Sequence, residues 1–261
     1  MLSYQHIYHA GNLADVQKHA LLAAMLDYMG QKPKPMSYLE THAGRGVYQL
    51  NAEAAVKTGE AEAGIGRAED WFGADHPYMR ALAAVRAKHG AQAYPGSPAL
   101  AAALTRAEDT LQFCELHPQE AEALRGAMRG SGAKVHQKDG YETVIGICPP
   151  TPRRGVLLID PSYEIKSDYK TLPNMVAHVH RKWNVGVIAL WYPILRDGLH
   201  KPMITALKGK NFPKVLHHEV SFPAAREGHR MIGSGMFILN APYGLEQEAA
   251  HLTARFAEIN S

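Results

Sequence analysis

The chain comprises 261 residues, of which 46% are hydrophobic and 20% are charged, and its formal net charge is +3. This composition is typical of a globular protein, and no apolar run approaches the roughly 20 residues that span a bilayer. The first residues lack the basic segment and apolar core of a signal peptide, so the sequence predicts a cytoplasmic protein with no membrane partner.

The first predicted element is an amphipathic helix over residues 12–30, which the prolines of the stretch 32–35 bring to an end. A short buried strand over residues 36–40 follows. It runs directly into a turn that contains Gly44 and Gly46. Glycine permits backbone conformations that other residues avoid, so such a turn allows the chain to approach a ligand closely.

Residues 51–94 differ in composition from the rest of the chain, because alanine, glycine and charged residues dominate them. They contain two helix-like stretches, 67–72 and 78–88, and nothing that resembles a sheet strand. Because the α/β pattern resumes afterwards, we interpret residues 51–94 as an inserted helical subdomain. Residues 1–50 and 95–261 then form the main domain.

Strands and helices alternate through the remainder of the chain. The further predicted strands cover residues 110–115, 133–137, 155–160, 184–191, 214–222 and 235–240. The further predicted helices cover residues 98–106, 118–128, 169–182 and 200–208, and a helical turn follows residues 139–140. This alternation predicts an α/β fold with a mainly parallel sheet covered by helices on both faces.

The chain contains 15 histidines and two cysteines, but none of the spacings that mark local metal sites. Neither Cys-x-x-Cys nor His-Glu-x-x-His occurs, and the neighbours His217 and His218 would point to opposite faces of a strand. We therefore expect no metal site. Cys114 and Cys148 lie in apolar contexts typical of buried thiols, which argues against a cysteine nucleophile.

Polar residues follow four of the predicted strands, at the sheet edge where doubly wound proteins bind their ligands. They lie in the segments 40–46, 115–117, 138–140 and 160–163. The glycine turn lacks the P-loop and full dinucleotide patterns, and a simple tight turn remains an alternative. Glu115 suits hydrogen bonding to ribose hydroxyls, with a solvated carboxylate as the alternative. Together these segments predict one ligand-binding crevice.

The tetrapeptide Asp160-Pro161-Ser162-Tyr163 ends the most hydrophobic predicted strand. The lone pair of an aromatic amine is delocalised into its ring. A side-chain acceptor and a nearby backbone carbonyl can hold both amine protons and stabilise the charge that develops during attack on a methyl group. Proline removes a competing N–H, and the tyrosine ring offers a stacking platform for a base. These residues therefore predict methylation of an amine on a planar group.

At these residues the chain resembles the RlmJ family of 23S rRNA adenine-N6 methyltransferases, whose wider class carries Asp-Pro-Pro-Tyr and close variants. The resemblance runs from residue 2 to about residue 243. The matching segments are Leu2-Ser3-Tyr4, His9-Ala10-Gly11-Asn12-x-Ala14-Asp15-Val16-x-Lys18-His19, Tyr38-Leu39-x-Thr41-His42-Ala43-Gly44-x-Gly46-x-Tyr48, Tyr94-Pro95-Gly96-Ser97-Pro98, Glu115-Leu116-His117-Pro118 and Asp139-Gly140-Tyr141. Ser162 departs from the wider class, in which many members have a second proline.

The resemblance implies a Rossmann-like class I methyltransferase fold, with a seven-stranded mainly parallel sheet and a small helical insertion. It implies S-adenosyl-L-methionine as the cofactor, contacted by His19, His42, Ser97, Glu115, Asp139, Gly140 and Asp160. Asp160, Pro161 and Tyr163 are then the catalytic residues, and Tyr4, Lys18 and Tyr163 bind the substrate. The implied partner is 23S rRNA before full ribosome assembly, and the implied state is a monomer.

Two other functions remain open at the level of sequence. A DNA adenine-N6 methyltransferase would usually carry a target-recognition region, and residues 51–94 are short and not notably basic. A non-catalytic RNA-binding or ribosome-assembly module could have kept the fold, although the retained Asp160 and Tyr163 argue against it.

Overall fold

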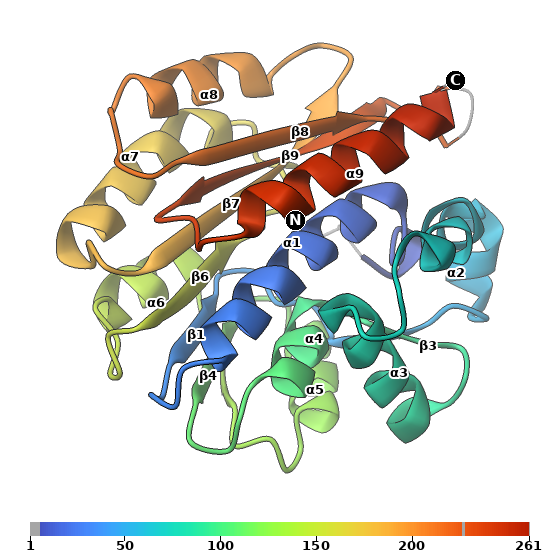
Figure 1. Cartoon of the computed structure of the whole chain (residues 1–261), viewed down its shortest axis with the longest axis horizontal. Helices are drawn as coiled ribbons and strands as arrows, with labels where there is room; N and C mark the ends of the chain where they lie inside the picture. Colours follow the sequence, from blue (N-terminus) through green and yellow to red (C-terminus); the bar gives the residue numbers. More distant parts are fainter. Residues whose placement is uncertain (1–5, 226–227, 261) are drawn as a thin grey trace.

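The computed structural model describes residues 6–225 and 228–260, and a seven-stranded sheet forms its centre (Figure 1). The strands, in the order in which they lie across the sheet, are β5 (Lys134–His136), β4 (Thr110–Cys114), β1 (Ser37–Glu40), β6 (Gly155–Ile159), β7 (Val187–Leu195), β9 (Met231–Leu239) and β8 (Leu216–Ser221). The first five are parallel, whereas β9 is antiparallel to both of its neighbours. The predicted seven-stranded, mainly parallel sheet is confirmed.

Helices cover both faces of the sheet, as the alternating pattern predicts. One face carries α1 (Leu13–Gly30), α3 (Pro77–His89), α4 (Ser97–Leu104), α5 (Pro118–Ala127) and α9 (Leu245–Asn260). The other face carries α6 (Gly140–Ile147), α7 (Asp168–Lys182) and α8 (His200–Lys208). All five residues of β6 are buried, because this central strand has helices on both sides.

Helix α1 is unusual because it buries polar side chains as well as apolar ones. The side chain of Asn12 caps its N-terminus by accepting a hydrogen bond of 2.9 Å from the backbone N–H of Asp15. Asp15, Lys18 and His19 are at most 3% exposed. Their spacing of three and four residues places them on one side of the helix, and buried charges of this kind need partners.

The region between β1 and α4 contains short elements that differ from the prediction. Strands β2 (Val47–Gln49) and β3 (Ala93–Pro95) pair antiparallel at its two ends, although no strand is predicted there. Between them lie α2 (Glu53–Thr58), a π-helical turn η2 (Glu62–Gly66), a 3-10 turn η3 (Glu69–Trp71) and α3.

The predicted helix-like stretch 67–72 is helical as far as Trp71, and a tertiary contact accounts for the π-helical turn that precedes it. The N–H of Ile65 donates to the carbonyl of Gly11 at 2.7 Å, outside the helix. A Cβ on Gly64 would lie 2.0 Å from the same carbonyl oxygen, so only glycine allows this approach. The start of α1 thus shapes the segment between β1 and α4.

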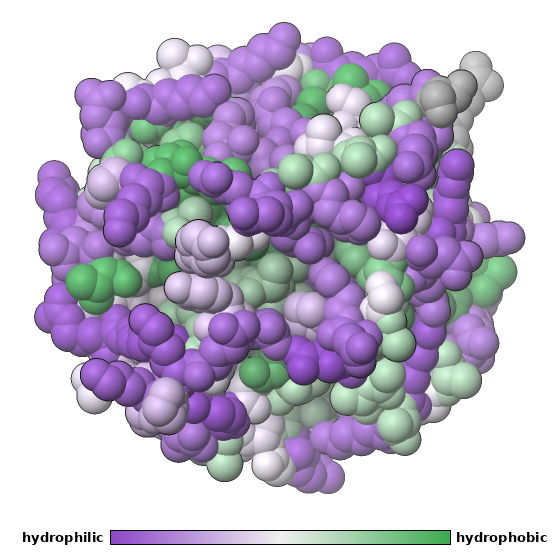
Figure 2. Space-filling view, in the orientation of Figure 1, coloured by the Kyte–Doolittle hydropathy of each residue, from purple (hydrophilic) through white to green (hydrophobic). Residues whose placement is uncertain are grey.

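Helix α9 is not among the predicted elements. Its buried residues Leu245, Ala249, Leu252 and Phe256 recur at spacings of three and four, which is the pattern of an amphipathic helix. The face of the molecule in Figure 2 is mainly hydrophilic with scattered hydrophobic residues, as expected for a chain whose apolar helix faces point inward. Among the described helices, none has the length and apolarity needed to cross a membrane.

The centre of the sheet should dominate the stability of the fold. Leu158 on β6 is fully buried, so we expect Leu158→Ala to lower the free energy of unfolding by about 2–5 kcal/mol. Val185, which is 58% exposed, provides the control, because Val185→Ala should change stability by only about 0.5 kcal/mol. Urea denaturation of the three proteins measures both effects, and equal stabilities would contradict the assignment of β6 to the core.

Candidate active site

A cavity of about 360 Å³ opens at the carboxyl ends of the parallel strands. Ten predicted site residues line it, namely Lys18, His19, His42, Ser97, Glu115, Asp139, Gly140, Asp160, Pro161 and Tyr163. Tyr4, the remaining predicted residue, lies outside the described residues. The cavity is of the size that holds small ligands. Its lining unites segments that follow β1, β4, β5 and β6, because parallel strands end on the same edge of the sheet.

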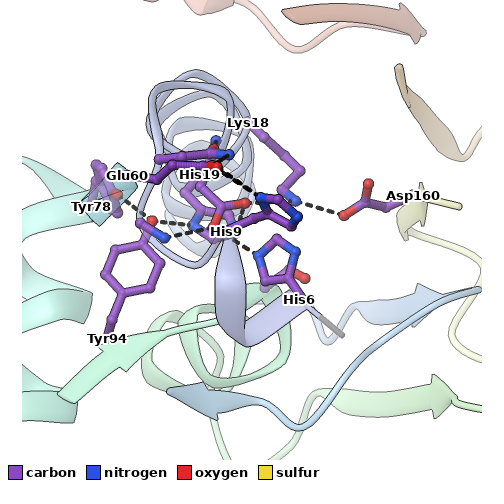
Figure 3. Close-up of polar contacts among 12 residues, drawn as sticks. His6, His9, Lys18, His19, Glu60, Tyr78, Tyr94 and Asp160 are labelled. Atoms are coloured by element: carbon purple, nitrogen blue, oxygen red, sulfur yellow. Dashed lines mark hydrogen bonds and ion pairs between the residues drawn. The ribbon is translucent and has the colours of Figure 1, made fainter. Parts of the chain in front are cut away.

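Asp160 follows β6 and pairs with Lys18, which reaches it from α1 (Figure 3). Lys18 Nζ lies 2.7 Å from Asp160 Oδ2 and 2.9 Å from Asp15 Oδ1. The side chains of Lys18, Asp15 and Asp160 are 4%, 2% and 12% exposed. The ammonium group is therefore held between two carboxylates with little access to water.

The charged groups of this cluster stabilise one another's ionised forms. Burial by itself lowers the pKa of Lys18, but Asp15 and Asp160 raise it well above its usual value, so the ammonium stays charged. Burial raises the pKa of Asp15, and His6, Lys18 and His19 more than offset this, so that it falls well below its usual value. Asp15 also accepts hydrogen bonds of 2.9 Å from His6 Nε2 and from the backbone N–H of Gly11.

His19 is fixed on the other side of the cluster by two tyrosines. Its Nδ1 lies 2.9 Å from the hydroxyl of Tyr94, which is 2.8 Å from the hydroxyl of Tyr78. Burial lowers the pKa of His19 to about 3, although the neighbouring Asp15 opposes the shift. The imidazole is therefore neutral near pH 7, and it presents a polar but uncharged surface to the cavity.

Glu40 ends β1 and is fully buried behind the cavity wall. It accepts a hydrogen bond from Ser97 Oγ, and its Oε2 accepts a second one of 3.0 Å from the hydroxyl of Tyr38. Burial raises the pKa of Glu40 to about 8. Asp160 also raises it, whereas the hydrogen bonds from Ser97 and Tyr38 lower it. Glu40 is thus a carboxyl group that keeps its proton near pH 7, next to the charged Asp160.

The glycine turn after β1 meets the segment after β4 through Glu115. The two carboxylate oxygens of Glu115 accept the backbone N–H groups of Gly44 and His117, each at 2.8 Å. Gly44 has a φ of 61°, and a Cβ there would lie 2.5 Å from the hydroxyl of Tyr48. The turn therefore requires glycine, and it holds the Glu115 carboxylate in one orientation.

The segment after β5 completes this side of the cavity. Asp139 caps α6 by accepting the N–H of Glu142 at 2.9 Å. Gly140 lies so close to β1 that a Cβ would be 1.9 Å from the carbonyl oxygen of Thr41. His42 Nδ1 lies 2.8 Å from the Thr41 hydroxyl, and burial lowers the pKa of His42 to about 4. His42 is therefore a neutral imidazole beside the glycine turn.

Tyr163, in the turn after Asp160, does not form the open stacking platform that the sequence predicts. Tyr163 has a φ of 57°, is only 6% exposed and donates to the carbonyl oxygen of Trp191 at 2.7 Å. Its ring packs on Tyr169 with 4.6 Å between centroids. Ser162 is exposed, and its hydroxyl lies 3.5 Å from the N–H of Glu164, which is too long for a strong hydrogen bond.

Two further residues of the site, Asp15 and Trp191, were not predicted, and Glu40 was predicted only as part of the segment 40–46. The helical spacing of Asp15, Lys18 and His19 is a signal that could have identified Asp15, since charged residues recur on one side of an otherwise apolar helix. Trp191 lies within β7, and Lys18 Nζ is 5.2 Å from the centre of its ring. A tryptophan in a predicted strand carries no local signal for such a contact.

The order of the strands defines the class of this protein. Numbered along the chain, the seven strands run 3-2-1-4-5-7-6 across the sheet, with only the seventh antiparallel. With a glycine turn after the first strand and Asp-Pro-x-Tyr after the fourth, this is the fold of class I methyltransferases.

Comparison with known families agrees with this class and narrows it. The family model described as "RsmJ: Ribosomal RNA large subunit methyltransferase D, RlmJ" matches residues 33–259, and the chain belongs to this family. The Escherichia coli (strain K12) protein named "Ribosomal RNA large subunit methyltransferase J" is 39% identical over 95% of this chain and 90% of its own length. The Haemophilus influenzae protein of the same name is 34% identical over the same shares.

A solved structure shows the same arrangement of the chain. The crystal structure of a protein from Legionella pneumophila str. Philadelphia 1 superposes with a TM-score of 0.85 and 29% sequence identity. The alignment covers 96% of this chain and 94% of the other. The similarity therefore extends over nearly the whole fold, including the segment between β1 and α4.

The protonated state of Glu40 gives a test of the site's electrostatics. The pKa of Glu40 in the folded protein, about 8, lies above its ordinary value of 4.5. The raised pKa of Glu40 therefore makes its full contribution to the free energy of unfolding below pH 4.5, and this contribution is lost as the pH rises towards 8. Glu40→Gln stays neutral, so its stability relative to wild type should grow over this range, by at most about 1.4 kcal/mol per pH unit.

Denaturant unfolding at several pH values measures this difference. Glu122 is the matched control, because its side chain is 78% exposed and Glu122→Gln should follow the wild-type pH profile. Parallel profiles for Glu40→Gln and wild type would show that Glu40 is ionised in the folded protein.

Proposed function

We propose that this protein is an S-adenosylmethionine-dependent methyltransferase that methylates the N6 amine of one adenine in 23S ribosomal RNA. The observation that carries the proposal is the position of Asp160, which ends a central strand in the cavity of a chain that belongs to the RlmJ family. Two relatives that cover nearly the whole chain are named as methyltransferases of large-subunit ribosomal RNA. The cavity provides acceptors where such a reaction needs them.

The residues around the cavity fit the proposed cofactor. We assign its binding to His19, His42, Ser97, Glu115, Asp139, Gly140 and Asp160, all of which line the cavity. Glu115, oriented by Gly44 and His117, offers a fixed carboxylate to ribose hydroxyls. His19 and His42 are neutral near pH 7, so they add no positive charge that would repel a sulfonium. When bound, the cofactor supplies an electrophilic methyl group.

Asp160 and the backbone after it would prepare the adenine amine. Asp160 accepts one amine hydrogen, and the carbonyl oxygen next to Pro161 accepts the other, which localises the nitrogen lone pair for attack. The amine would accept the methyl group that the bound cofactor supplies, and Asp160 would take up the surplus amine proton and release it to solvent. Because Lys18 holds Oδ2 of Asp160 at 2.7 Å, the carboxylate is oriented before the substrate arrives.

The target base must leave its stack to reach this cavity. We assign the substrate contacts to Tyr163, Tyr4 and Lys18, and Trp191 adds an aromatic wall to the cavity. Tyr163 is fixed by Trp191 and Tyr169, so it forms a rigid part of the cavity wall rather than an open stacking platform. We further propose that residues 51–94 form an inserted subdomain on a methyltransferase domain of residues 1–50 and 95–261. The protein would act as a monomer in the cytoplasm on RNA that is not yet fully assembled.

Asp160→Asn should lower the rate of methyl transfer by at least about 100-fold, since it removes the charge that stabilises the developing positive nitrogen. Binding of the cofactor should change by only a few-fold, because the remaining contacts stay in place. Single-turnover transfer of a labelled methyl group measures the first effect, and calorimetric titration measures the second. Asp75→Asn, at an exposed position of the chain, is the control. Near-normal transfer by Asp160→Asn would contradict the proposed mechanism.

The choice of substrate can be tested directly with labelled cofactor. We expect transfer to protein-free 23S rRNA, less to assembled large subunits, and none to duplex DNA. Nucleoside mass spectrometry of rRNA from cells without the protein should show the loss of one N6-methyladenosine. Preferred methylation of DNA would identify a DNA enzyme, and cofactor binding without transfer to any RNA would favour a non-catalytic RNA-binding module.

A further inference from the structure

Three segments that are distant in sequence meet at the rim of the cavity through His9, Glu60 and His229, of which Figure 3 labels the first two. His9 precedes α1, Glu60 follows α2, and His229 lies in the connection between β8 and β9. His9 and His229 line the cavity. The Glu60 side chain is 2% exposed, whereas those of His9 and His229 are 28% and 19% exposed. A buried carboxylate thus faces two imidazoles that solvent can reach.

The ligand atoms of these residues already lie close together. His9 Nδ1 is 3.0 Å from Glu60 Oε2, and His229 Nε2 is 4.0 Å from Glu60 Oε1. One ligand atom of each residue lies within 4.8 Å of the other two. In a tetrahedral zinc site with bonds of about 2.0–2.1 Å, two ligand atoms are about 3.3 Å apart. Side-chain movements of about 1 Å would therefore bring all three atoms to bonding distance of one cation.

The surroundings of Glu60 and of the imidazoles also fit a metal site. Asn12 Nδ2 donates to Glu60 Oε2 at 3.0 Å, so an amide orients the carboxylate from the side of α1. Ligating carboxylates are usually held by such hydrogen bonds. The rings of His9 and His229 are nearly parallel, with an interplanar angle of 11° and centroids 6.2 Å apart. Each imidazole already presents one nitrogen to the Glu60 carboxylate.

We propose that His9, Glu60 and His229 bind one divalent transition-metal cation, represented by zinc, at the rim of the cavity. Two imidazoles and one carboxylate suit zinc and its neighbours, whereas magnesium and calcium prefer oxygen ligands alone. Three protein ligands leave a position for water. The bound cation would link the start of α1, the inserted segment and the β8–β9 connection. The site shares no residue with the proposed methyl-transfer site.

The sequence alone gives no sign of this site. The expectation that the chain has no metal site rests on local spacing rules, and these rules find only ligands that are neighbours along the chain. Here 51 residues separate His9 from Glu60, and His229 lies far beyond both. Only the packing of the segment between β1 and α4 against α1 brings these side chains together.

Zinc titration of the full-length, tag-free protein tests the proposal. After treatment with a chelator, the protein is titrated in competition with a chromophoric zinc indicator. We expect one zinc per chain with a dissociation constant of about 10 µM or lower, since structural zinc sites bind far more tightly than this. His229→Ala and Glu60→Gln should each weaken binding at least about 10-fold, because each removes a ligand.

A matched control and a second measurement separate this site from the other histidines. His89, at the end of α3 and outside the cavity lining, is the control, and His89→Ala should bind zinc as wild type does. Cobalt should give visible absorption bands that zinc abolishes, and these bands should be absent in His229→Ala. Circular dichroism of each metal-free variant confirms that it is folded. Wild-type zinc affinity in folded His229→Ala, or no stoichiometric binding by wild type, would overturn the proposal.

Discussion

The ion pair between Lys18 and Asp160 is the interaction on which the architecture of the site depends. It joins residues 142 positions apart and ties α1 to the end of the central strand β6. Both charges are shielded from water, so the Asp160 carboxylate depends on Lys18 for compensation, whereas Lys18 is also paired with Asp15. Asp15 also pairs with the Lys18 ammonium and so holds it in one position. Lys18 in turn holds the Asp160 carboxylate in one orientation.

The parallel sheet determines where the remaining groups lie. The ends of β1, β4, β5 and β6 meet along one edge, so Glu40, Glu115, Asp139 and Asp160 gather there without any long-range signal in the sequence. The four carboxyl groups differ in environment. Glu40 is sealed behind the wall and keeps its proton, whereas Asp160 is held by a cation. One sheet edge thus offers a neutral carboxyl and a charged one side by side.

The start of α1 also organises the segment between β1 and α4. The carbonyl oxygen of Gly11 receives a hydrogen bond from Ile65, and Asn12 both caps α1 and holds Glu60. The residues that precede Lys18 therefore position the rim of the cavity as well. A change in this short stretch would alter both the charged cluster and the rim, because the same backbone supports them.

The sequence by itself determined the order of the seven sheet strands and of the helices between them, but not β2, β3 or α9, and it placed polar residues after four of the strands. Periodicity and turn residues, which carry these predictions, are local properties. The sequence also identified ten residues that line one cavity, and its family resemblance is confirmed. Only the tertiary structure decided the pairing of Lys18 with Asp15 and Asp160, the burial of Tyr163, the irregular helix near Gly64 and the meeting of His9, Glu60 and His229. These features depend on contacts between distant segments, and local sequence patterns carry no record of which distant groups will share a buried space.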